Sequence, residues 1–261
     1  MSDRRYWTAT LFLYIIVDGI TTQARGALVP TFKDVFHVSD SLLGLVSPAF
    51  SIGYLITLFA IGMRAGDVDI KKFLFLGTVL TPLAMIFLGF SPVFFMILGS
   101  MFVRGLATGS VRGLDRPILS HLYPSSRSKV FNLFALFWAI GAASGPLLVN
   151  LSLSLGNWRL IYYLLFGISF FIPFLVWKAD LPDNIKNERS ISIEELKEVV
   201  KSPIVIYMII IILLDLGLEA SLFTWLPYYA SQYFSKSMSN VVLSVFLSSY
   251  IPGRYIYSVL S

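Results

Sequence analysis

Ionisable side chains lie deep inside stretches of this sequence that are otherwise apolar. They include carboxylates that could carry protons and guanidiniums that could bind polar or acidic groups: Asp18, Arg25, Arg104, Asp215, Glu219 and Arg254. A charge at the centre of a bilayer costs at least about 2.5–3.5 kcal/mol, and such residues usually face a wet cavity or one another. We therefore expect this set to handle protons or a solute.

The first group lies near the N-terminus. Asp18 and Arg25 are seven residues apart, about two helical turns, so they share a face with Thr22, and Gln23 lies close by. Arg104 lies at a depth similar to that of Asp18 in its own apolar stretch, which predicts a contact between them. A fixed Asp18–Arg104 pair would be structural, whereas a breakable one would be a coupling switch, and a buried ion pair is compatible with both. Asp18 is a candidate proton site, and the others are candidate cavity residues.

Asp215 and Glu219 form the second group. They are four residues apart, so a helix places them on one face. Two carboxylates in a low dielectric cannot both be charged cheaply, so we expect one to hold a proton and the pair to titrate as a unit. Alternatively, each hydrogen-bonds a neighbour in further spans that are missing from this sequence. Arg254, further along the chain, is a candidate cavity residue.

Other polar and aromatic residues carry weaker signals. Trp138 could line a cavity, although aromatic residues near the ends of spans are more often interfacial anchors. Arg112, Asp115 and Arg116 follow an apolar stretch and are expected to mark the cytoplasmic mouth.

Composition sets the class of protein. Of the 261 residues, 56% are hydrophobic and 13% are charged, which excludes an ordinary soluble domain. Without cysteine, and with only His37 and His121 as histidines, a metal site is not expected. No nucleotide-binding glycine-rich loop occurs, so we expect no enzyme activity, no cofactor and no ATP-driven transport. The net charge of +5 is better explained by basic cytoplasmic loops than by nucleic acid.

A spanning helix needs about 20 mostly apolar residues. The sequence predicts eight spans: Trp7–Pro30, Leu42–Gly62, Phe73–Phe90, Val93–Leu114, Val130–Leu155, Leu160–Trp177, Ile204–Tyr229 and Val241–Leu260. Lysine and arginine in the loops fall mostly on the side of the N-terminus, which predicts a cytoplasmic N-terminus in a cell membrane. The polar stretch Ala179–Ser202 contains Ser192-Ile-Glu-Glu195, a pattern that starts a short amphipathic helix. We expect residues 1–178 to form a six-helix bundle, 179–202 a cytoplasmic linker, and 203–261 an incomplete second bundle.

Several motifs resemble the major facilitator superfamily. The loop from Gly62 to Lys72 is similar to the Gly-x-x-x-Asp-Arg-x-Gly-Arg-Arg gating loop of that family, in a degenerate form. Asp67 lies one residue later than the usual aspartate, and Lys71 and Lys72 replace the basic pair. Arg104-Gly-Leu-Ala-Thr-Gly109 resembles the fourth-span arginine motif, and Gly141-Ala-Ala-Ser-Gly145-Pro146 the fifth-span motif. The family implies twelve spans, of which eight are present here.

Shorter patches resemble the fucose-permease-like sugar porters. They are Asn132-Leu-Phe-Ala-Leu-Phe-Trp-Ala-Ile-Gly141, Glu219-Ala-Ser-Leu-Phe-Thr-Trp225-Leu-Pro and Gly253-Arg254.

The resemblance implies an all-α secondary transporter that is embedded in lipid and uses protons to move a small polar solute, sugar-like or a small organic acid, by alternating access. The alternatives are a proton-coupled drug or metabolite antiporter, and a non-transporting membrane sensor or inactive fragment. We expect residues 1–261 alone not to transport.

Overall fold

The protein is all-α in the part of the chain that the structure describes. A computed structural model describes residues 2–64, 69–180 and 193–260. The helices are α1 (Ser2–Phe36), α2 (Asp40–Leu43), α3 (Val46–Arg64), α4 (Ile70–Phe90), α5 (Phe94–Leu122), α6 (Arg127–Ser154), α7 (Leu160–Phe170), α8 (Ile172–Lys178), α9 (Ile193–Val200), α10 (Pro203–Ala230), α11 (Lys236–Ser248) and α12 (Tyr250–Leu260). This confirms the predicted fold class.

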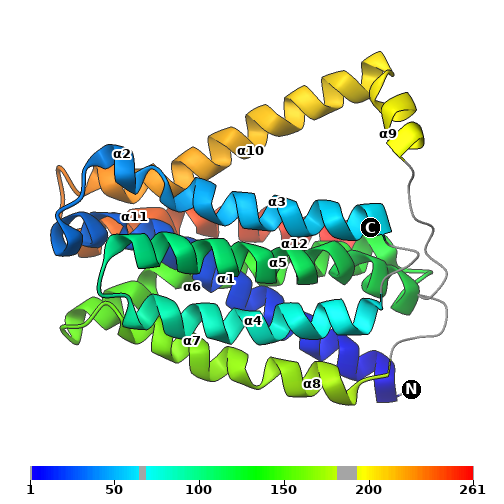
Figure 1. Cartoon of the computed structure of the whole chain (residues 1–261), viewed down its shortest axis with the longest axis horizontal. Helices are drawn as coiled ribbons and strands as arrows, with labels where there is room; N and C mark the ends of the chain where they lie inside the picture. The colour runs from blue at the N-terminus through cyan, green and yellow to red at the C-terminus, as the bar shows by residue number, and fades with distance from the viewer. Residues whose placement is uncertain (1, 65–68, 181–192, 261) are drawn as a thin grey trace.

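The helices run back and forth along the long axis of the molecule (Figure 1). The start of α1, the end of α12, the end of α8 and the start of α9 lie at one end. The turns from α4 to α5, α6 to α7 and α10 to α11 lie at the other. This up-and-down order arises because short polar turns can join only antiparallel neighbours.

Six segments are long and apolar enough to cross a membrane. They are Asp40–Met63, Ile70–Phe90, Phe94–Leu122, Arg127–Ser154, Leu160–Lys178 and Pro203–Ala230. Helix α1 and the pair α11–α12 run beside them but do not meet the same criterion of length and hydropathy. The predicted count of eight spans is therefore not confirmed and stays a prediction, as does the division into two bundles and a linker.

Several predicted boundaries shift by one or two turns. Helix α1 continues past Pro30 to Phe36, and α5 continues past Leu114 to Leu122. The predicted sixth span is two helices that meet at Phe171, where Pro173 lies in the first turn of α8. Proline is tolerated there because the first amide groups of a helix have no partner within the helix. Helix α9 lies within the predicted amphipathic segment, although Ser192 is outside the described residues.

Glycine allows close contacts between helix backbones, several of them along α1. A Cβ on Gly19 of α1 would lie under 3.0 Å from the carbonyl oxygen of Trp138 in α6, and one on Gly141 would equally meet Ile16 of α1. A Cβ on Gly26 of α1 would meet the carbonyl oxygen of Phe223 in α10. Small residues of this kind bring membrane helices together. They fix α1 against α6 and, further along, against α10.

Helix α10 is packed unevenly. Its second half contacts α1 and α11, whereas most of its residues from Ile206 to Leu218 are exposed and apolar. In Figure 1 this half runs away from α3 towards α9. An exposed helix that is apolar on every side is suited to lipid or to further helices.

Candidate functional site

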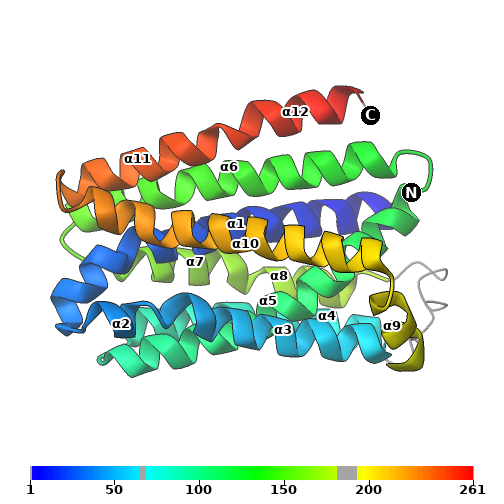
Figure 2. The same ribbon diagram turned by 90° about the horizontal axis from the view of Figure 1, so that it is seen from above.

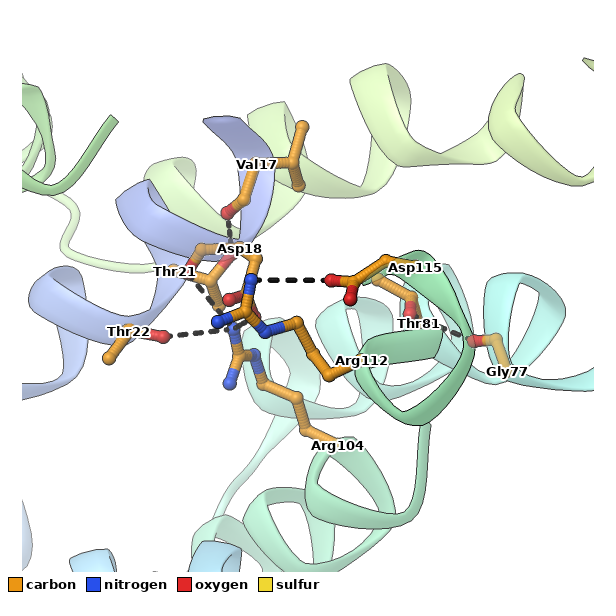
Figure 3. A network of polar contacts seen from close by, with 9 residues as sticks. All are labelled: Val17, Asp18, Thr21, Thr22, Gly77, Thr81, Arg104, Arg112 and Asp115. Atoms are coloured by element: carbon orange, nitrogen blue, oxygen red, sulfur yellow. Dashed lines mark hydrogen bonds and ion pairs between the residues drawn. The ribbon is translucent and has the colours of Figure 1, made fainter. Parts of the chain in front are cut away.

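The charged pair at the centre of the bundle joins α1 to α5. Nη2 of Arg104 lies 3.0 Å from Oδ1 of Asp18, and the two side chains are 3% and 6% exposed. The same nitrogen donates to the backbone oxygen of Asp18 at 3.3 Å and to the hydroxyl of Thr22 at 3.4 Å (Figure 3). The contact predicted from matched depth is therefore present. Its role, as a lock or as a switch, stays a prediction.

Arg25 and Phe50 complete what we call the central cluster: Asp18, Thr22, Arg25, Phe50 and Arg104. The guanidinium carbons of Arg25 and Arg104 lie 5.2 and 5.0 Å from the centroid of the Phe50 ring, within cation–π range. Phe50 comes from α3, so three helices build the cluster. Phe50 could not be predicted from the sequence, because a cavity-facing phenylalanine in an apolar span looks the same in sequence as a lipid-facing one.

A second buried ion pair lies beside the first. Oδ2 of Asp115 is 3.4 Å from Nη1 of Arg112, one turn earlier on α5, and Asp115 is fully buried. Figure 3 shows the guanidinium of Arg112 next to Asp18. Arg116, the next residue, is exposed. Asp115 is buried because α5 continues for two turns past Leu114 and is covered there by α3 and α4. That Arg112, Asp115 and Arg116 mark a cytoplasmic mouth stays a prediction.

Gln23 and Trp138 lie away from the central cluster. Gln23 starts from the face of α1 that meets α6, where its Cβ lies near Gly145, although the whole side chain is buried and its amide atoms have no partner among the described residues. Trp138 is half-buried, and its ring packs 6.4 Å from that of Phe223. It therefore contacts α10 at the boundary between the predicted halves.

The residues predicted in the seventh and eighth spans are not brought to the central cluster. Asp215 and Arg254 are exposed. Glu219 is half-buried, and its Oε1 accepts a hydrogen bond of 3.0 Å from the hydroxyl of Tyr250 in α12. The alternative, in which each carboxylate bonds a neighbour in further spans, stays a prediction, since the partner of Glu219 found here is Tyr250 of the same chain. Shared titration of Asp215 and Glu219 stays a prediction.

The gating-loop residues lie at the end of the molecule that holds the start of α1. Gly62 is exposed, and Asp67 lies outside the described residues. Nζ of Lys71 lies 3.5 Å from Asp180, and Nζ of Lys72 lies 3.2 Å from Asp69. Asp69 also caps α4, since it accepts from the backbone N–H of Lys72 at 3.1 Å. This bond and the Lys72 ammonium lower the pKa of the Asp69 carboxyl.

At the opposite end, polar contacts join α1 and α2 to α10 and α11. We call this the end cluster: Lys33, Asp34, Asp40, Tyr228 and Lys236. Lys33 lies 2.7 Å from Asp40 and 2.5 Å from the hydroxyl of Tyr228, which donates to Asp40 at 2.8 Å. Lys236 pairs with Asp34.

Two further contacts strengthen the same junction. The hydroxyls of Ser47 and Thr224 are 2.9 Å apart, and Asn240 donates to Asn150 at 2.9 Å. The predicted halves are thus held together at this end by side-chain hydrogen bonds and ion pairs. Among the described residues no group of three or more potential metal ligands occurs.

Known proteins with similar sequences or folds are membrane transporters or their relatives. The chain is 24% identical over 252 residues to a protein described as a TsgA homologue from Buchnera aphidicola (subspecies Acyrthosiphon pisum), covering 95% of this chain and 64% of that protein. It is 22% identical over 265 residues to the glucose/mannose transporter GlcP of Bacillus subtilis, covering 96% and 65%. The chain therefore spans slightly less than two-thirds of the length of these relatives.

Comparison with solved structures gives the same fold. The crystal structure of the E. coli fucose:proton symporter FucP superimposes with a TM-score of 0.71 at 17% identity, over 97% of this chain and 70% of that one. Residues 11–261 match the sequence model of the Major Facilitator Superfamily. This family consists of membrane transporters and not of enzymes, so the resemblance drawn from the motifs is confirmed: the chain belongs to the Major Facilitator Superfamily.

Proposed function

We propose that the chain is part of a proton-coupled secondary transporter of the cell membrane that moves a small polar solute, sugar-like or a small organic acid. The observation that carries this proposal is the central cluster. A carboxylate and two guanidiniums are buried together in the middle of a membrane bundle, which is expensive unless they bind something or change partners. The names of two similar proteins, a glucose/mannose transporter and a fucose:proton symporter, support the choice of solute and of proton coupling.

Alternating access would use the end cluster. The distribution of lysine and arginine in the loops favours a cytoplasmic N-terminus. In that orientation the end cluster faces the outside and closes the path between the halves there. Its contacts join helices of residues 1–178 to helices of residues 203–261, so rocking of one half against the other would have to break them. The Lys71 and Lys72 loop would lie on the cytoplasmic side, in the position of the family's gating loop.

Asp18, Asp215 and Glu219 are the proposed proton carriers. Asp18 forms an ion pair with Arg104 and could exchange that partner for a proton when a solute binds. Glu219 is held by the neutral hydroxyl of Tyr250, which can bond either form of a carboxyl group.

The test uses the full-length protein in proteoliposomes with an imposed proton gradient. D-glucose, L-fucose, D-glucuronate and D-glycerate serve as labelled probes. We expect wild type to accumulate at least one probe against its gradient. Neutralising the carrier (Asp18→Asn, Asp215→Asn or Glu219→Gln) should abolish accumulation but leave counterflow exchange, because exchange need not cycle the empty protonated site. Gradient-driven accumulation that survives all three substitutions would reject proton coupling through these residues.

A drug antiporter is less well supported. The fifth-span motif that favoured it lies where Gly141 and Gly145 pack against α1, so the glycines have a structural use here.

A further inference from the structure

The charges buried between α1 and α5 do not balance. Asp18 pairs with Arg104, and Asp115 pairs with Arg112. Arg25 has a relative exposure of 7%, and among the described residues no ion pair or hydrogen bond reaches it. One positive charge is thus left over, and it lies in the central cluster.

The surplus charge lies next to another cation. The guanidinium carbons of Arg25 and Arg104 lie 5.2 and 5.0 Å from the centroid of the same Phe50 ring. The positive charge of Arg104 also acts electrostatically on Arg25. In a low dielectric such charges repel, and a cation–π contact offsets only part of that repulsion. An arrangement of this kind is stable when an anion lies between or beside the two guanidiniums.

Hydrogen-bond donors without acceptors surround this position. Nε of Arg25, Nε of Arg104 and the hydroxyl of Tyr162 are buried and have no partner among the described residues. Tyr162 belongs to α7 and lies within electrostatic reach of both arginines. A buried donor without an acceptor is costly. Two guanidiniums and a phenol form a donor set that matches a carboxylate, which only accepts and binds arginine in a bidentate way.

We infer that the transported solute carries a carboxylate group and that this group binds Arg25 and Arg104 beside Phe50. The inference rests on the proposed transport function and narrows its substrate class. One surplus positive charge matches one carboxylate, whereas a doubly charged phosphate would leave an excess negative charge in the bundle. A neutral sugar would leave Arg25 without a counter-ion.

The experiment compares solutes that differ only in the acid group. D-glucuronate is paired with D-glucose, and D-glycerate with glycerol. Each is titrated into the full-length protein in detergent at pH 7, and the rise in Tm gives an apparent Kd. We expect the acid of at least one pair to raise Tm and its neutral partner to have little effect. Arg25→Gln should weaken the acid's Kd on the order of 10- to 100-fold, the loss expected for one charge-assisted hydrogen-bonded contact.

Arg127→Gln is the matched control. Arg127 is the exposed first residue of α6 and donates to the backbone oxygen of Ser120, and its substitution removes one positive charge far from the cluster. It should leave the acid's Kd unchanged. The Tm of Arg25→Gln without solute should not fall below wild type, because the substitution removes a buried charge that has no partner. A fall would show that Arg25 has a structural counter-ion and would overturn the inference.

Two further results also overturn it: no acid raises Tm, or each neutral partner raises Tm as much as its acid. The proposed function fails separately. If the protein transports D-glucose and does not respond to any acid, the inference that the solute carries a carboxylate is rejected. The proposal that the protein is a transporter is then retained. Acid binding that depends on Arg25, without uptake driven by a proton gradient, would keep the carboxylate site and reject proton coupling.

Discussion

The central cluster and the charges of α10 and α12 contain the same residue types in opposite surroundings. Asp18, Arg25 and Arg104 are buried among three helices, with ion pairing or aromatic contacts. Asp215 and Arg254 lie in equally apolar segments but are exposed. The difference shows that the apolar run around a charge does not decide its environment. The neighbouring helices decide it, and α10 has few neighbours along its first half.

The largest effect should come from breaking the central ion pair. Arg104→Ala leaves Asp18 buried without its partner and should lower the free energy of unfolding by about 3–5 kcal/mol. Arg254→Ala, at an exposed site, should change it by less than about 0.5 kcal/mol. Thermal unfolding in detergent measures both. The double variant Asp18→Ala/Arg104→Ala should be less destabilised than Arg104→Ala alone. Equal losses for Arg104→Ala and Arg254→Ala would contradict the contrast between the regions.

The next effect concerns packing. Gly141→Ala places a Cβ against the backbone of Ile16 and should cost about 1–3 kcal/mol, because the carbonyl cannot move aside freely. Gly253→Ala in α12 meets open space and should be neutral or stabilising by up to about 1 kcal/mol. The same unfolding measurement compares them. A neutral Gly141→Ala would mean that α1 and α6 are further apart than described.

A smaller effect is expected within the last helices. Tyr250→Phe removes the hydrogen bond to Glu219, which is half-buried, and should cost about 0.5–1.5 kcal/mol. Asp215→Asn, at an exposed residue, should change stability by no more than about 0.5 kcal/mol. If Asp215→Asn proves the more destabilising, then Asp215 contacts a helix outside the described residues. Its surroundings would then resemble those of the buried charges in the central cluster.

The smallest effects should be equal in the first and the second predicted half, because they involve exposed helix caps, one on α4 and one on α11. Asp69 caps α4, and Ser235 caps α11 by accepting from the N–H of Met238 at 3.2 Å. Replacing either with alanine should cost about 1 kcal/mol locally. Hydrogen exchange of the first-turn amides measures this fraying.

The two caps should differ only in their response to pH. The folded-state pKa of Asp69 is lowered by Lys72. Its stabilising contribution is therefore fully present above the unfolded value of about 3.9. It is lost as the pH falls from there through the lowered pKa. The Ser235 cap should not titrate. If the first turns of α4 and α11 lose stability in the same way as the pH falls, Asp69 does not cap α4 as described.

The parts of the fold that depend on a single property of the sequence could be predicted. Runs of about 20 apolar residues identify helices, and equal depth along two of them was enough to predict the contact of Asp18 with Arg104. Gln23 starts from a different face than Asp18 because neighbours in sequence are turned by about 100° on a helix, and its role as a cavity residue stays a prediction. It starts from the α6 face of α1, while Asp18 and Arg25 face α3 and α5.

The rest of the site depends on tertiary packing. Asp115 follows the apolar run of α5, and only the coverage by other helices shows that it is buried. Phe50 joins the site because α3 packs along α5, where Gly105 meets the carbonyl oxygen of Phe50. Neither fact is encoded in local composition. Both depend on which helices are neighbours.

The glycine contacts of α1 have a mechanical consequence. Along α6 the backbones interlock at Gly19 and Gly141, so α1 could slide only by a full turn, about 5.4 Å, to reach an equivalent fit. Helices α1 and α6 should therefore move as one rigid body. With α10, by contrast, α1 makes its glycine contact at a single point, where a Cβ on Gly26 would meet the carbonyl oxygen of Phe223. A change in crossing angle at that point displaces no side chain of α1, so Gly26 is suited to act as a pivot.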